Sequence, residues 1–121
     1  MLDLEAIELI KQLKARYFRF IDTCDLEGLK TVFTEDAQAY FKGGHYEFSL
    51  NGWVELEQFY KDSFTPTKFG MHQGHHPEIS VDGDTATGIF DFNPYRILEV
   101  RCANGDCAIL GVLNGISQKV I

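Results

Sequence analysis

The chain has 121 residues, of which 45 % are hydrophobic, and a formal net charge of −7 at pH 7. A chain of this length supports one domain with a single core. An acidic surface repels phosphate backbones, so we expect no nucleic-acid partner. No apolar run approaches the roughly 20 residues of a membrane helix, and the N-terminus lacks the basic and apolar stretches of a signal peptide. We therefore expect a cytoplasmic protein with no membrane partner.

The first third of the chain is predicted to be helical. Apolar residues recur at spacings of three and four over residues 3–22, with Lys14 among the polar residues between them. This spacing predicts an amphipathic helix with Lys14 on the solvent side. Asp25 is a suitable N-cap for a shorter helix over residues 26–33.

The remaining residues favour strands, because apolar and polar residues alternate and β-branched and aromatic residues are frequent. Asp82-Gly83 is a strong tight-hairpin signal. The expected strands cover residues 37–41, 45–50, 71–81, 85–92, 95–103 and 107–113, with a third helix over residues 52–62 capped by Asn51. Helices followed by consecutive antiparallel strands predict an α+β domain with the helices packed on one face of a curved antiparallel sheet.

The three cysteines, Cys24, Cys102 and Cys107, show no metal-type spacing. Cys102 and Cys107 could face each other across a hairpin at Asn104-Gly105. A chain with no export signal favours reduced thiols, however, and this is the state that we expect.

Three of the four histidines, His72, His75 and His76, fall within five positions, which makes the segment a candidate proton-transfer or metal site. A regular strand that points Ile79 toward the core also points His75 inward and His72 outward. A β-bulge at Gly74 would instead turn both His72 and His75 inward. Neighbouring strand residues face opposite sides, so His75 and His76 do not readily share an ion, and we expect no metal.

Asp22 stands at the expected C-terminal end of the first helix. The negative end of the helix dipole and the apolar neighbours both disfavour a charged carboxylate there, which suits a general base. Tyr17 lies less than half a turn away around the helix axis and could donate a hydrogen bond to a substrate carbonyl. The alternative is that Asp22 caps the following turn and that Tyr17 is a core aromatic residue.

With these residues the chain resembles the SnoaL-like family of the nuclear transport factor 2 (NTF2) superfold, which includes polyketide cyclases, scytalone dehydratase and the bile-acid 7α-dehydratases. The stretches that carry the likeness are residues 4–22 with 29–37, residues 71–79 and residues 83–88. The resemblance implies an NTF2-like cone whose open end forms an apolar pocket. The family's catalytic roles would fall on Tyr17, Asp22 and His72, with His72 and Asp22 abstracting a proton next to a carbonyl and Tyr17 polarising its oxygen.

The resemblance also implies no metal or organic cofactor, a homodimer, and a small apolar, polycyclic substrate. The candidates for contact with such a substrate are His75, Phe33, Tyr40, Trp53, Phe59, Phe90 and Phe92. Ordinary core packing is the alternative role for most of these aromatic residues.

We treat residues 1–121 as a single SnoaL-like domain that becomes atypical from about residue 93. Asn93 and Pro94 stand where the bile-acid dehydratases carry a further acidic residue, and the usual final strand pair is not recognisable. Loss of the last strand would leave an exposed sheet edge and a less enclosed pocket. Two hypotheses follow: a cofactor-independent lyase or isomerase that uses acid/base chemistry, or a non-catalytic ligand-binding or dimerisation domain.

Overall fold

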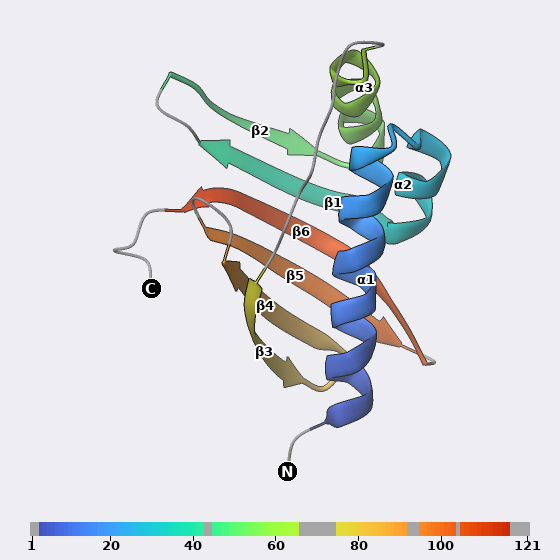
Figure 1. Cartoon of the computed structure of the whole chain (residues 1–121), viewed down its shortest axis with the longest axis vertical. Helices are drawn as coiled ribbons and strands as arrows, with labels where there is room; N and C mark the ends of the chain where they lie inside the picture. Colours follow the sequence, from blue (N-terminus) through green and yellow to red (C-terminus); the bar gives the residue numbers. More distant parts are fainter. Residues whose placement is uncertain (1–2, 43–44, 66–74, 92–94, 104, 117–121) are drawn as a thin grey trace.

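Helices cover one face of a curved sheet (Figure 1). The computed structural model describes residues 3–42, 45–65, 75–91, 95–103 and 105–116. Within these residues the helices are α1 (Leu4–Asp22), α2 (Leu26–Val32) and α3 (Trp53–Ser63). The strands are β1 (Phe33–Lys42), β2 (Glu47–Asn51), β3 (His75–Asp82), β4 (Thr85–Asp91), β5 (Tyr95–Ala103) and β6 (Asp106–Ile116). No helix in these ranges is long and apolar enough to cross a bilayer.

The six strands form one sheet in the order β2-β1-β6-β5-β4-β3. All neighbours run antiparallel except β1 and β6, which are parallel. The sheet is therefore mixed, and the prediction of a purely antiparallel sheet needs this correction. The last strand, β6, pairs with β1 on one side and β5 on the other. The strand predicted over residues 107–113 is thus present within the sheet and not at its edge.

The helix boundaries follow the capping residues closely. Asp3 accepts a hydrogen bond from the backbone N–H of Ala6 at 3.0 Å and starts α1. Asp25 does the same for α2, accepting from the N–H of Gly28 at 2.9 Å, as predicted. The predicted cap of α3 is one residue early, because Gly52 occupies the N-cap position with a positive φ of 85°.

The core lies between the sheet and the helices. The buried stripe of α1 faces β6 and β3, whereas α3 packs on β1 and β2. The largest fully buried side chains are Tyr17, Ile10, Leu13, Leu29, Leu56, Leu98, Ile109, Val32, Val100 and Val112. Two charged residues, Lys14 and Arg96, are buried among them. The prediction that Lys14 lies on the solvent side of α1 is therefore wrong.

An irregularity in β3 changes which way its histidines face. His75 pairs with Asp91 and Glu78 pairs with Ile89, so β3 has one extra residue between these pairs. His76 adopts a positive φ of 49°, as bulged residues often do. A bulge here reverses the strand's alternation, so His75 is exposed instead of pointing into the core as expected. The bulge position first considered, Gly74, lies outside the described residues.

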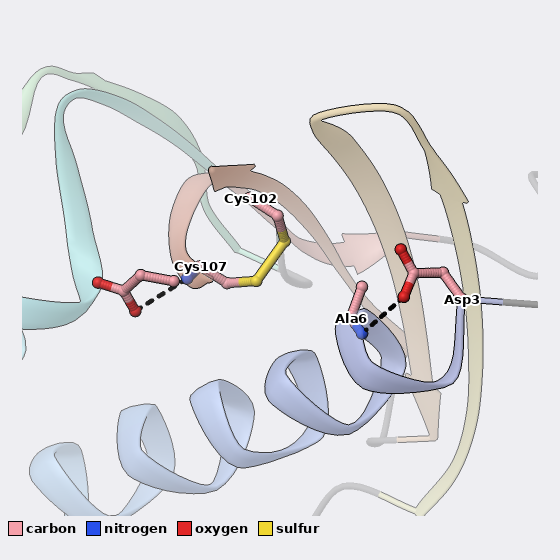
Figure 2. Close-up of a disulfide and its surroundings, with 5 residues drawn as sticks. Asp3, Ala6, Cys102 and Cys107 are labelled. Atoms are coloured by element: carbon pink, nitrogen blue, oxygen red, sulfur yellow. Dashed lines mark hydrogen bonds between the residues drawn. A yellow bond between two sulfur atoms is a disulfide. The ribbon is translucent and has the colours of Figure 1, made fainter. Parts of the chain in front are cut away.

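Cys102 and Cys107 form a disulfide between β5 and β6 (Figure 2). The two residues are direct cross-strand partners with Cα atoms 4.2 Å apart, a separation typical of a closely spaced antiparallel pair. The prediction of reduced thiols at these two positions is therefore wrong, because the hairpin brings the sulfur atoms together. Cys24 is the free cysteine among the described residues.

Candidate functional site

A cavity of about 560 Å³ lies between α1 and the strands β3 and β4. From α1 it is lined by Lys14, Phe18 and Asp22, which are spaced four residues apart and so share one side of the helix. Pro77 from the bulged part of β3 and Phe90 from β4 line the opposite wall. Lys11 and Arg19 line it as well, so the cavity combines three basic side chains, a carboxylate and two aromatic rings.

The Lys14 side chain is 3 % exposed, and its ammonium nitrogen sits among aromatic rings. Nζ lies 4.2 Å from the ring centroid of Phe18, 5.1 Å from that of Tyr17 and 5.0 Å from that of Phe90. In the part of the chain that the structure describes, Nζ has no hydrogen-bond partner. Burial, and then the charge of Arg96, lower the pKa of Lys14 from 10.5 to about 6.

Arg96, on β5, places a second cation on the same rings. It is 4 % exposed, and its guanidinium carbon lies 5.6 Å from the Tyr17 centroid and 5.3 Å from the Phe18 centroid. Cation–π attraction favours the charge on both residues, whereas burial and mutual repulsion oppose it. An arginine does not lose its proton in proteins, so Lys14 is the residue that becomes neutral.

Neither buried cation was predicted from the sequence, although the spacing of apolar residues around Lys14 indicates that it is buried. Ile10 stands four residues before it, and Tyr17 and Phe18 stand three and four after it. These are the spacings of the apolar stripe itself, so Lys14 belongs to the buried stripe of α1. Arg96 left no comparable signal, because strand alternation alone does not say which face is covered by a helix.

Tyr17 lies in the core next to this cavity. It is 1 % exposed, and its hydroxyl oxygen lies 3.1 Å from that of Tyr60 on α3, which makes a buried hydrogen bond. Burial raises the pKa of Tyr60 well above 10, and the neighbouring Tyr17 hydroxyl adds to the effect. The Tyr60 phenol therefore stays protonated over the physiological range.

Asp22 is half-buried at the C-terminal end of α1 and lines the cavity. Thr23, the next residue, occupies the C-cap and donates its hydroxyl to the Arg19 carbonyl oxygen at 2.8 Å. Tyr17 and Asp22 thus lie on one helix with different surroundings, the first in the core and the second on the cavity wall. His72, the third proposed catalytic residue, lies outside the described residues.

The aromatic residues predicted to line one pocket lie in different parts of the structure. Phe90 lines the cavity, whereas Phe33 packs on Tyr17, Trp53 and Tyr60 with ring centroids 5.6–6.1 Å apart. Phe59 belongs to a cluster with Phe41 and Phe48 near the other end of the sheet. Phe92 lies outside the described residues.

Two further candidates lie away from the helix-covered face. Tyr40 alternates with the buried Ala39 and Phe41 on β1, so it lies on the opposite face of the sheet and donates its hydroxyl to Glu47 at 2.9 Å. A substrate in the cavity beside α1 would not reach it. His75 is exposed, with its ring 6.3 Å from that of His76. Across the described ranges, no three histidine, cysteine, aspartate or glutamate side chains gather as a metal site would require.

Known proteins share the sequence pattern and the architecture of this chain. A family model described as a SnoaL-like domain matches residues 2–101. A structure from Novosphingobium aromaticivorans, provisionally named an aromatic ring hydroxylase, is 20 % identical with a TM-score of 0.79 and covers 93 % of this chain and 90 % of its own. An NTF2-like protein from Streptomyces avermitilis, provisionally named a dehydratase, is 13 % identical with a TM-score of 0.73. The match covers 93 % of this chain and 96 % of that one.

A third structure, again from Novosphingobium aromaticivorans, is provisionally named a scytalone dehydratase. It is 16 % identical with a TM-score of 0.71, and the match covers 92 % of this chain and 83 % of that one. At these identities the three likenesses establish the fold alone. They confirm the predicted NTF2-like α+β architecture.

Proposed function

Because this chain belongs to the SnoaL-like domain family, we propose that it is a lyase or isomerase of the dehydratase or cyclase type. Its substrate would be a small, apolar, cyclic carbonyl compound, and the reaction would use acid/base chemistry. The observation that carries the proposal is the cavity beside α1, which Asp22 lines together with Phe18 and Phe90. Two structural neighbours named as dehydratases support an elimination as the reaction type.

In this proposal Asp22 is the general base that takes a proton from the carbon next to the substrate carbonyl. The half-buried end of α1 keeps bulk water from fully solvating its carboxylate. His72 is its proposed partner in proton transfer. Tyr17 does not line the cavity, and its hydroxyl bonds to that of Tyr60 in the core, so in this proposal its ring supports Phe18 on the cavity wall instead of donating to the substrate oxygen.

The cavity's aromatic walls support an apolar ring as the group that is bound. Phe18 and Phe90 are 7 % and 3 % exposed and present flat apolar surfaces. A volume of about 560 Å³ is in the range of small-molecule sites. Specificity would then come from the polar groups on the wall, Asp22 and Lys14 among them.

Deuterium exchange tests the proposal without knowledge of the natural substrate. We expect the protein to catalyse exchange of the α-protons of 2-tetralone in D₂O, followed by proton NMR. Asp22→Asn should slow this exchange by about 10²-fold or more, since it removes the base. Asp62→Asn, an exposed carboxylate on α3, is the matched control and should exchange at the wild-type rate.

Circular dichroism in the near ultraviolet would show that both variants are folded. Full exchange activity in folded Asp22→Asn would overturn the role of Asp22. Saturable binding of 2-tetralone with no exchange by the wild-type protein would overturn the catalytic proposal. It would favour the alternative hypothesis of a ligand-binding domain.

A further inference from the structure

We propose that Lys14 is a covalent site, at which the cavity beside α1 forms an imine with the carbonyl group of a bound apolar aldehyde or ketone. The inference rests on the proposed function only for the place where the substrate binds. It adds a nucleophile that the acid/base proposal does not use, and it narrows the substrate class to compounds with an accessible carbonyl.

The first argument is the position of the amine. Only 3 % of the Lys14 surface is exposed, yet the residue lines a cavity large enough for a small ring compound. Its Nζ has no hydrogen-bond partner within the described ranges, so no oxygen accepts its protons and no donor engages its lone pair there. Phe18 and Phe90 flank the nitrogen and would flank a ring-bearing ligand in the same way.

The second argument is the local charge. An amine attacks a carbonyl only when it is neutral, and an exposed lysine is almost wholly protonated at pH 7. Arg96 lies within 5.6 Å of the centroids of the same Tyr17 and Phe18 rings and holds a permanent positive charge. Burial and this charge together bring the pKa of Lys14 to about 6, so most of the amine is neutral at pH 7. A lysine next to a second cation in an apolar pocket is a known way to activate this nucleophile.

The groups that face Lys14 come from each element packed around it. Phe18, Tyr17 and Asp22 lie on its own helix, Phe90 comes from β4 and Arg96 from β5. Asp22 is two turns further along the same side of α1, while the charge that acts on the Lys14 pKa is that of Arg96. Lys11 and Arg19, also on the cavity wall, are exposed and add positive charge.

The covalent step balances without an oxidant or reductant. The lone pair of Lys14 Nζ forms a bond to the carbonyl carbon, and the C=O π pair moves to oxygen. Both protons of the attacking nitrogen then pass to that oxygen, which leaves as water, and a C=N bond remains. Protonation of that imine makes the neighbouring C–H of the ligand more acidic.

Lys11 is a matched control that the chain itself offers. It lies on the same helix, three residues earlier, and lines the same cavity, but its side chain is exposed. Lys61 on α3 is exposed as well. A general preference of the cavity for benzaldehyde would favour both Lys11 and Lys14, whereas activation by burial and Arg96 favours Lys14 alone.

The test is reductive trapping of the whole folded protein with benzaldehyde and sodium cyanoborohydride at pH 7, with peptide mapping by mass spectrometry. We expect Lys14 to gain the benzyl group at least about tenfold faster than Lys11 or Lys61. Its rate should saturate with benzaldehyde concentration, and benzyl alcohol, which lacks the carbonyl, should slow it. Equal rates at the three lysines would overturn the proposal.

Two further measurements make the result independent of any one variant. Lys14→Met should lose the fast labelling, and Lys61→Met, on α3 and outside the cavity lining, should keep it. In the wild-type protein, labelling of Lys14 should level off just above pH 6, where the amine is neutral, while labelling of Lys11 should still rise. A Lys14 rate that rises in parallel with Lys11 would contradict the inference even if Lys14→Met does not fold.

The two proposals fail separately. Asp22→Asn should lose α-proton exchange of 2-tetralone and still be trapped by benzaldehyde at Lys14. Exchange without preferential trapping would leave the acid/base proposal standing and remove the covalent site. Trapping without exchange by the wild-type protein would leave Lys14 as a carbonyl-binding residue of a non-catalytic pocket.

Discussion

The hydroxyl groups of Tyr17 and Tyr60 lie 3.1 Å apart in the core, although 43 residues separate them in the sequence. Their side chains are 1 % and 4 % exposed, so no water competes for this hydrogen bond. The bond joins α1 to α3 and thereby fixes both helices against the same face of the sheet. Each hydroxyl is the buried partner that the other needs.

A double-mutant cycle should measure this dependence. Tyr17→Phe leaves the Tyr60 hydroxyl buried and unpaired, and we expect it to lower the free energy of unfolding by about 1–3 kcal/mol. Tyr17→Phe combined with Tyr60→Phe should cost less than the sum of the single changes, by about 1 kcal/mol. Urea denaturation of the four proteins provides the values. Strict additivity would mean that the hydroxyls do not interact.

The buried amine of Lys14 should make stability depend on pH. The pKa of Lys14 is about 6 in the folded chain, whereas an unfolded chain has the ordinary lysine value of 10.5. Between these two pH values the unfolded chain therefore binds more protons than the folded chain. The free energy of unfolding therefore rises with pH through this window and falls as pH drops toward 6. From pH 6 to pH 8 we expect a gain of about 2 kcal/mol from this residue.

Urea denaturation of Lys14→Met at the same two pH values isolates that contribution. This variant has no amine to titrate, so its stability should change less with pH than that of the wild-type protein. Lys11→Met, which removes an exposed amine of the same helix, should keep the wild-type dependence. Parallel pH curves for wild-type protein and Lys14→Met would show that the amine stays charged in the fold.

Local sequence patterns predicted the helices and most strands because each depends on neighbours along the chain. The Asp25 cap and the Tyr95–Ala103 strand are found where the sequence placed them. The parallel pairing of β1 with β6 is different. It joins residues about 70 apart, such as Gln38 and Gly111, and no local signal records such a contact.

The candidate site was predictable only in part for the same reason. Asp22 is on the cavity wall, where the end of an amphipathic helix suggested a functional carboxylate. The orientation of His75 depends on a bulge at His76, and periodicity alone does not locate a bulge. Arg96 becomes a neighbour of Lys14 only when β5 and α1 pack together, so their electrostatic coupling appears only in the folded chain.

Gly88 controls the position of an aromatic ring in the cavity wall. A Cβ atom at this buried residue would lie 2.8 Å from Cε2 of Phe90, so the ring must move. We expect Gly88→Ala to lower the free energy of unfolding by about 1–3 kcal/mol, as overpacking does. Because Phe90 also contacts Lys14, benzaldehyde trapping of Lys14 should slow as well.

Gly111→Ala is the control for this change. Gly111 is also a buried strand glycine, but its added Cβ would meet its nearest atoms, those of Glu99, at an ordinary 3.5 Å. Thermal or urea denaturation should therefore find it close to the wild-type protein. If both alanine variants are equally stable, the Phe90 ring moves aside without cost.

The disulfide between Cys102 and Cys107 should stabilise the β5–β6 hairpin by a modest amount. The two cysteines are five residues apart, and closing so short a loop restricts the unfolded chain by about 2 kcal/mol in the chain-entropy model. In denaturant without reductant, alkylation should therefore modify one thiol, Cys24, and with reductant all three cysteines. Cys24→Ser should retain the loss of stability on reduction, whereas Cys102→Ser combined with Cys107→Ser should be insensitive to reductant. Three reactive thiols in the unreduced protein would show that the hairpin holds the cysteines opposite each other without a covalent bond.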